Sequence, residues 1–213
     1  YAYHRTTATG QLGIGLMVGF MDKTIDYSKF KAVDDDPLLN SLSGEESSML
    51  VDLSFGIHYQ VPGTYYLGLS STQLLQTKSA PLTDSQESEI RMVQKRHYYL
   101  TAGYFYTLPN NPSYEIMPSM LFKTDGASYA FDISALVRYN NRFWGGLSYR
   151  YQDAVSVILG MEYKNFHIGY SYDLTTSEIS NAGSAGTHEV MAGYKFKLEL
   201  EKISRSYKNT RFL

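Results

Sequence analysis

The stretch FHIGYSYDLT, residues 166–175, alternates strictly between two kinds of side chain. Its aromatic and aliphatic residues occupy even-numbered positions, whereas small or polar residues occupy the odd-numbered positions between them. A period of two places these two series on opposite faces of a β-strand. The same alternation recurs in SYAFDISALVRYN (128–140) and THEVMAGYKFKLEL (187–200). The sequence therefore predicts an all-β fold.

About eleven segments of the chain fit this strand template, and hairpins are the repeating unit, so we expect an antiparallel sheet. The segments lie near residues 1–8, 11–25, 49–61, 64–75, 93–107, 114–124, 127–139, 142–152, 154–163, 166–174 and 187–199. Most are ~9–13 residues long, whereas strands of soluble proteins usually have ~5–6 residues. A tilted membrane strand needs ~9–11 residues. The lengths therefore favour a transmembrane barrel.

The connections between these segments divide into two kinds. Short connections follow the odd-numbered segments, at TTATGQ, VPG, LPNNPS, NN and KN. The three long connections, residues 26–48, 76–92 and 175–186, follow even-numbered segments. Strands that alternate in direction place all long connections on one rim. Outer-membrane barrels show this asymmetry, with short periplasmic turns and long extracellular loops.

Composition supports a barrel over a soluble β-sandwich or a lipocalin-like barrel. The chain has 20 Tyr, and several of them stand at one end of an apolar strand face, where a membrane interface selects Tyr. Most glycines lie on the polar face, which is the crowded concave side of a barrel.

The formal net charge is -2, so the chain has no overall positive field for nucleic acid. No apolar run reaches the ~18 residues of a membrane helix.

The stretch 166–175 also contains the residue types of a nucleophilic triad. His167, Ser171 and Asp173 share one strand face, but each step of two residues separates side chains by ~7 Å. A triad needs direct hydrogen bonds of ~2.6–3.2 Å, and no GxSxG motif occurs in the chain. We therefore expect no catalytic residue, and we expect that the protein is not an enzyme.

Other possible sites are equally weak. We expect four histidines, His4, His58, His97 and His167, to face a wet interior. They do not predict a metal cluster, because no two of them share a metal-ligand spacing. Asp34, Asp35 and Asp36 lack the pattern of a calcium loop, and a solvated loop is expected there. GIGLMVG lies within a strand, so it does not predict a phosphate-binding loop. The chain contains no Cys. We predict no metal site and no cofactor.

Several stretches resemble the PorP/SprF family. The last predicted hairpin carries most of the resemblance, in IGYSYDLTTSEIS (168–180) and GTHEVMAGYKFK (186–197). The tail KISRSYKNTRFL (202–213) is also similar to the family. YRYQDAVSVILGMEYKNFHIGYSYD (149–173) and GIGLMVGFMDKTIDYSKF (13–30) extend the match over most of the chain.

The resemblance implies a membrane β-barrel of the bacterial outer membrane in the type IX protein secretion and gliding motility machinery of Bacteroidetes. It implies a role in exporting or anchoring cargo proteins, such as adhesins with a type B C-terminal domain. The implied partners are membrane lipid, other secretion components and cargo, without nucleic acid. No family motif assigns a site residue. An outer-membrane channel for uptake of small or hydrophobic solutes is the alternative function that the sequence leaves open.

Two expectations concern the ends of the chain. YAYHRT already fits a strand at the first residue, and bacterial single-chain barrels close with an even number of strands. We therefore expect an N-terminally incomplete copy of a larger, even-stranded barrel in residues 1–199. Alternation stops after KFKLEL, and basic residues then recur every third position. We expect residues 200–213 to form a basic periplasmic tail that contacts a partner.

Overall fold

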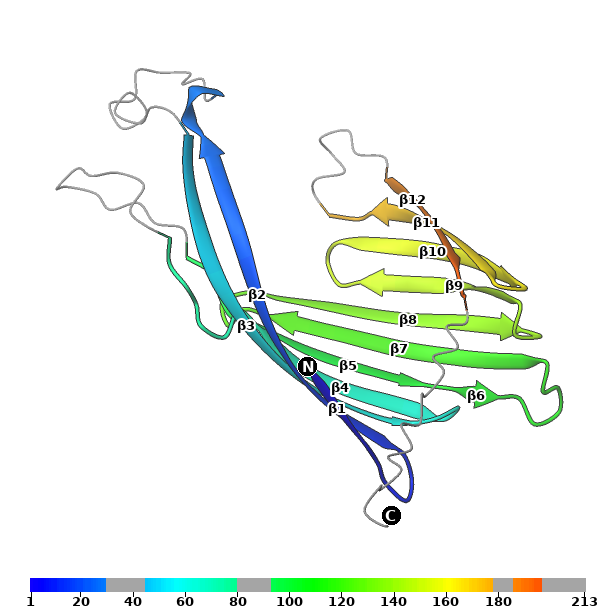
Figure 1. Ribbon diagram of the computed structural model, residues 1–213. Coiled ribbons are helices and arrows are strands. Elements are labelled where there is room, and N and C mark those ends of the chain that lie inside the picture. The colour runs from blue at the N-terminus through cyan, green and yellow to red at the C-terminus, as the bar shows by residue number, and fades with distance from the viewer. Residues whose placement is uncertain (30–44, 80–92, 178–185, 197–213) are drawn as a thin grey trace, which may run out of the picture.

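A computed structural model of the chain describes residues 1–29, 45–79, 93–177 and 186–196 (Figure 1). The strands are β1 (Ala2–Thr6), β2 (Gln11–Asp26), β3 (Glu45–Val61), β4 (Tyr65–Thr72), β5 (His97–Tyr104), β6 (Tyr106–Thr107), β7 (Tyr114–Thr124), β8 (Tyr129–Tyr139), β9 (Phe143–Arg150), β10 (Ala154–Tyr163), β11 (Phe166–Thr175) and β12 (Thr187–Tyr194). Residues Tyr27–Lys29 form the 3-10 helix η1.

All twelve strands belong to one sheet, and every pairing in it is antiparallel; β5 and β6 both pair with β7 and not with each other. The order along the sheet runs from β1 to β12, with β6 beside β7 and otherwise without a crossover. Figure 1 shows this sheet as a curved wall in which β1 and β12 are the two edges. Among the described residues the wall does not close on itself, because β1 pairs there only with β2 and β12 only with β11. The prediction of an all-β, antiparallel barrel-like fold is confirmed.

Most predicted strand positions agree with the structure, and four of them need correction. The predicted strand 187–199 ends at Tyr194, and residues 195–196 are not part of it. β3 begins at Glu45 rather than at residue 49, because the β2–β3 ladder continues to the pair Asp26 and Glu45. These added residues are polar on both faces, so the alternating template could not detect them. The predicted strand 93–107 begins only at His97, since residues 93–96 pack on the preceding connection instead. The predicted strand 64–75 ends at Thr72.

The predicted strand 93–107 is also divided into two strands, and a proline on the neighbouring strand explains the division. β5 ends at Tyr104 and β6 begins at Tyr106. The register that pairs Gly103 with Ser119 and Tyr106 with Ile116 is constant, so it places Tyr104 opposite Pro118. Proline has no N–H group to donate to a neighbouring strand. On its other side Pro118 keeps its place in an unbroken ladder with β8.

The two faces of the sheet follow from the register. One face, which we call the outer face, carries apolar rows such as Ala135, Leu147 and Val157 on three neighbouring strands. The opposite face, which we call the inner face, carries most of the polar strand residues, such as Ser134, Ser148 and Ser156. The alternation read from the sequence therefore corresponds to two chemically distinct surfaces.

The outer face is open to its surroundings. Leu147 and Leu159 are 58% and 55% exposed. Among the described residues, only Leu50 and Ala154 are buried hydrophobic residues. A water-soluble fold of this size would bury a large apolar core. The exposed apolar face is instead the surface that a barrel presents to lipid.

Glycines on the inner face make room for aromatic rings from neighbouring strands. A Cβ atom added at Gly160 would overlap the Trp144 ring, and one at Gly103 would overlap the Tyr66 ring. Gly145 lies on the outer face, where the nearest side-chain atom to an added Cβ would be a Leu159 methyl at 3.0 Å. This crowding is expected on the concave side of a curved sheet.

The connections gather at two rims. The short-turn rim holds the turns between β1 and β2, β3 and β4, β6 and β7, β8 and β9, and β10 and β11. In one of them, Asn140 and Asn141 adopt φ angles of 50° and 55°, as a two-residue hairpin turn requires. The long-connection rim holds the links from β2 to β3, β4 to β5 and β11 to β12. Two short turns, 125–128 and 151–153, also lie there, so this rim is mixed.

Within the described residues, no helix has the length and apolar character to cross a membrane.

Candidate functional site

The inner face carries most of the charged side chains of the wall, and several of them form ion pairs. Arg150 of β9 donates from Nε to Asp132 Oδ1 of β8 at 2.9 Å. It also donates from Nη1 to Asp153 Oδ2 in the following turn at 3.1 Å. These two pairs connect β9 with β8 and with the turn that follows β9.

A second set of ion pairs lies closer to the short-turn rim. Arg138 of β8 contacts Glu115 of β7 through one guanidinium nitrogen, while its Nε is buried without a hydrogen-bond partner. Lys195, just after β12, donates from Nζ to Glu162 Oε1 of β10 at 2.7 Å. The pairs therefore cover the span from β7 to β12. Sequence alternation placed these residues on the inner face but could not show which charges meet.

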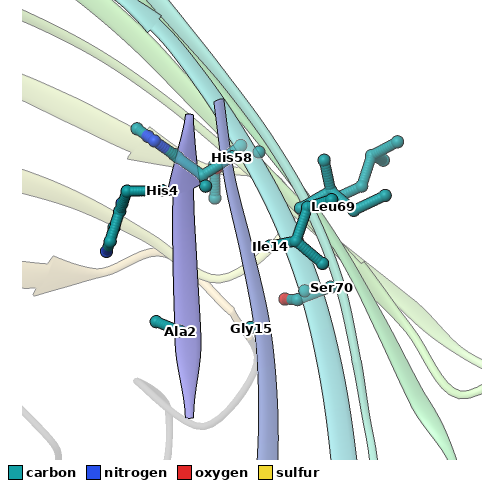
Figure 2. Close-up of a pocket in the computed structure, with 12 residues that line it drawn as sticks. Ala2, His4, Ile14, Gly15, His58, Leu69 and Ser70 are labelled. Carbon is teal, nitrogen blue, oxygen red and sulfur yellow. The ribbon is translucent and has the colours of Figure 1, made fainter. Parts of the chain in front are cut away.

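A groove of about 320 Å³ lies where β1 to β5 meet (Figure 2). Its floor lacks side chains because Gly13, Gly15, Gly56 and Gly68 lie on neighbouring strands of the inner face. In Figure 2 a different set of side chains, including Ile14 and Leu69, projects from the opposite side of these strands. The groove is thus a region of bare main chain bordered by a few polar side chains.

Two histidines border this groove. His4 of β1 and His58 of β3 both pair with Gly13 of β2, so they stand on either side of it. Figure 2 shows their rings pointing in different directions, without convergence on one point. His58 instead stacks on Tyr66, with ring centroids 5.9 Å apart. The groove offers surface for binding, and the two imidazoles do not form a chelating pair.

The residues of the apparent triad stay apart. His167 lies against Gly193 and faces Glu162 across the β10–β11 ladder, and its Nδ1 is buried without a partner. Ser171 faces Glu189 across the β11–β12 ladder, and Asp173 faces residue 187. Within residues 1–29, 45–79, 93–177 and 186–196, no hydrogen bond joins His167, Ser171 and Asp173. The geometry supports a wall strand at this stretch.

The structure locates some of the other segments considered in the sequence analysis, and the rest lie outside the described residues. His97 also lies on the inner face, and its Nδ1 is 3.0 Å from Gln73 Oε1. GIGLMVG lies within β2, as predicted. The described part of the chain contains no group of three or more side chains able to hold a metal ion. The acidic residues Asp34, Asp35 and Asp36 and the basic tail 200–213 lie outside the described residues.

One feature of the long-connection rim was missed from the sequence. Parts of the β4–β5 link, residues 73–79 and 93–96, pack against β3 above the end of β4. Leu74 N donates to Leu53 O at 2.9 Å, and Thr77 Oγ1 donates to Val51 O at 2.6 Å. The packing buries Leu50, Ser79 and Gln94, which are 1%, 2% and 4% exposed. We call these three residues the rim cluster.

The rim cluster anchors a long connection to the wall. Arg96 Nη2 donates to Leu74 O at 2.6 Å and so joins the two ends of the link. Gln94 Nε2 lies 3.9 Å from the Met21 sulfur, while its Oε1 is buried without a partner. Leu50 was the residue in the sequence that could have indicated this packing, because it is apolar on the otherwise polar face of β3. A reading by alternation treats such a residue as an exception.

Comparison with known families agrees with this architecture. The family model described as type IX secretion system membrane protein PorP/SprF matches residues 1–194, which is nearly the whole chain. That family groups secretion-system membrane proteins and is not a family of enzymes. No curated protein and no solved structure gives a significant match to the chain.

Proposed function

The chain belongs to the PorP/SprF family of type IX secretion system membrane proteins, and on that premise we propose that it acts in the bacterial outer membrane. Its role there is to assist the export or surface anchoring of secreted cargo proteins. The observation that carries this proposal is the exposed apolar outer face, with Leu147 and Leu159 more than half accessible. Such a face is stable against lipid and not against water.

Orientation is part of the proposal. The long-connection rim faces the cell exterior, and the short-turn rim faces the periplasm. The three long links on one rim support this direction, since outer-membrane barrels keep their long loops outside. The hairpin of β2 and β3 also continues past the outer apolar residue Phe20 into polar positions such as Asp22 and Asp26. Its polar tip suits the aqueous side of an interface.

Limited proteolysis with trypsin on intact cells tests the orientation. Lys78 lies in the β4–β5 link on the long-connection rim, and Arg142 lies in the β8–β9 turn on the opposite rim. We expect cleavage between residues 76 and 92 on intact cells, and cleavage after Arg142 only once cells are permeabilised. The opposite pattern would invert the topology.

Cargo and machinery contacts complete the proposal. Cargo such as adhesins with a type B C-terminal domain docks from the exterior, whereas other secretion components contact the periplasmic side. The basic tail, with Lys202, Arg205, Lys208 and Arg211, contacts an acidic periplasmic partner through charge.

Deletion of residues 202–213 should preserve insertion but weaken salt-sensitive co-purification of periplasmic components. Unchanged partners and normal cargo secretion would exclude this role for the tail.

A solute channel is the second candidate, and the charged inner face is the observation that favours it. Porin interiors are polar and filled with water, and here the side chains of Arg138, Arg150 and Glu162 line the inner wall. Planar-bilayer recordings separate the two functions. A secretion component is expected to co-purify with cargo and to show no solute-dependent conductance. Regular open-channel conductance without cargo association would favour the uptake channel.

A further inference from the structure

The outer face contains an apolar groove that the proposed function does not use. It has a volume of about 450 Å³ and lies over β4, β5, β7 and β8. Leu67, Met120 and Ile133 form its sides, while Ala102 and Pro118 lie between them. Register places Leu67 opposite Ala102, and Met120 opposite both Ala102 and Ile133, so these side chains follow one row across four strands.

The groove exists because two short side chains interrupt a surface of long ones. Ala102 ends at its Cβ, and the Pro118 ring is tied back to its own main chain. The same Pro118 interrupts the ladder between β5 and β7, since it has no N–H group. The notch is therefore built into the wall by the sequence and does not depend on a rotamer.

One end of the groove is polar. Tyr65 and Tyr104 face each other across the β4–β5 ladder and line the groove at the end nearest the short-turn rim. Both are partly exposed, at 40% and 45%. Tyrosine hydroxyls at the end of an apolar band occupy the level of lipid headgroups. An elongated ligand with an apolar chain and a polar head matches this arrangement.

We propose that this groove is a binding site for one acyl chain of a glycerophospholipid whose headgroup lies beside Tyr65 and Tyr104. The occupant follows from continuity, because the groove is part of the outer face that contacts lipid along the whole wall. The choice of a glycerophospholipid rests on the proposed orientation, in which the short-turn rim adjoins the periplasmic leaflet. Binding arises from van der Waals packing in the notch, since the surrounding lipid is equally apolar.

Native mass spectrometry of the full chain released from detergent micelles tests the site. The parent protein should retain one glycerophospholipid after most detergent is removed. Ala102→Trp fills the notch and should reduce the lipid-bound fraction by about tenfold, since several acyl-chain contacts are lost. Ala192→Trp is the matched control, because Ala192 lies on the outer face of β12, away from the groove. It should retain the lipid.

A lipid-bound fraction that is equal in both variants would overturn the proposal. A retained lipopolysaccharide, recognised by its mass, would contradict the choice of lipid. The readout needs no cargo or secretion assay, so a failure here leaves the proposed role in secretion unaffected, and the reverse also holds.

A fluorescence measurement covers the case in which Ala102→Trp does not fold. Trp144 is the single Trp of the chain and lies on the inner face, so Trp144→Phe supplies a background without Trp. In that background, Met120→Trp reports on the groove and Leu147→Trp on the plain outer face. In vesicles doped with brominated phospholipid, quenching at position 120 should saturate at a low brominated fraction. Quenching at position 147 should rise in proportion. Identical proportional curves would exclude a specific site.

Discussion

The two faces of the wall from β9 to β11 share strands and hydrogen bonds, yet their side chains find their contacts in different media. On the outer face, Leu147 and Leu159 are more than half exposed and have few protein neighbours. On the inner face, Gly160 lies under the Trp144 ring and Arg150 pairs with two carboxylates. Side chains of the inner face contact other protein groups, whereas side chains of the outer face are exposed to the medium around the protein.

This difference shows why the fold cannot be understood as a soluble one. Only Leu50 and Ala154 are buried hydrophobic residues in the described part of the chain, so no apolar core holds this sheet together in water. Stability must come from the ladders, the inner contacts and the lipid.

The largest effect is expected for a charge on the outer face. Leu159→Arg lies near the middle of β10 and should cost ~2–4 kcal/mol of unfolding free energy at the bilayer midplane. Ser171→Arg lies on the inner face opposite Glu189 and should change stability by less than about 1 kcal/mol. Chemical unfolding in phospholipid vesicles measures both. A larger cost at Ser171 would mean that the faces are reversed, and equal costs would contradict a difference between the two faces.

A smaller effect is expected from adding one methyl group to each face. Gly160→Ala places a Cβ in the Trp144 ring, and such overpacking costs about 1–3 kcal/mol. Gly145→Ala meets a Leu159 methyl at 3.0 Å, which can rotate away, and the Ile158 carbonyl oxygen at 3.5 Å, which is an ordinary contact distance. We expect no loss, or a gain of up to about 1 kcal/mol, since Ala restricts the unfolded chain. The same unfolding assay applies, and similar losses for both variants would contradict a crowded inner face.

The smallest effect is expected at the rim, in the turn between β7 and β8. Asp125 Oδ1 accepts hydrogen bonds from Ser128 N at 2.7 Å, Ser128 Oγ at 2.9 Å and Ala127 N at 3.0 Å. These bonds, led by the one from Ser128 N, lower the pKa of Asp125 from 3.8 to about 2. A carboxylate with a lowered folded-state pKa stabilises the fold above its unfolded pKa and loses that contribution as pH falls towards 2.

Asp125→Asn isolates this contribution, because an amide oxygen can still accept from the turn but does not titrate in this range. Unfolding between pH 5 and pH 2 should therefore depend less on pH in the variant than in the parent. The two curves should differ mainly below about pH 4. Parallel curves over the whole range would show that the turn does not couple to folding.

The sequence predicted the wall well because alternation is a local property. In FHIGYSYDLT, each residue lies on the predicted face, and β11 spans the same residues 166–175. Most glycines were also expected on the polar face, and glycines such as Gly146 and Gly160 do lie on the inner face. Assigning a residue to a face needs only the alternation of apolar and polar residues along its own strand.

The features that sequence analysis missed depend on contacts between distant segments. The rim cluster joins Leu50 to Ser79 and Gln94, and alternation does not link separate segments. The division of β5 from β6 came from Pro118 on the neighbouring strand, so nothing in the strand itself announced it. Ion-pair partners were missed for the same reason, since register between strands decides which charges meet.

Even and odd positions of one strand contact different media, and site-directed spin labelling can measure this difference residue by residue. The chain contains no Cys, so a single introduced Cys carries the only spin label. Labels placed in turn along β10, residues 154–163, can be compared for collision with oxygen in lipid and with a water-soluble nickel chelate. We expect odd-numbered positions, including 157 and 159, to favour oxygen, and even-numbered positions, including 158 and 162, to favour the chelate. A reversed pattern, or no period of two, would contradict the account.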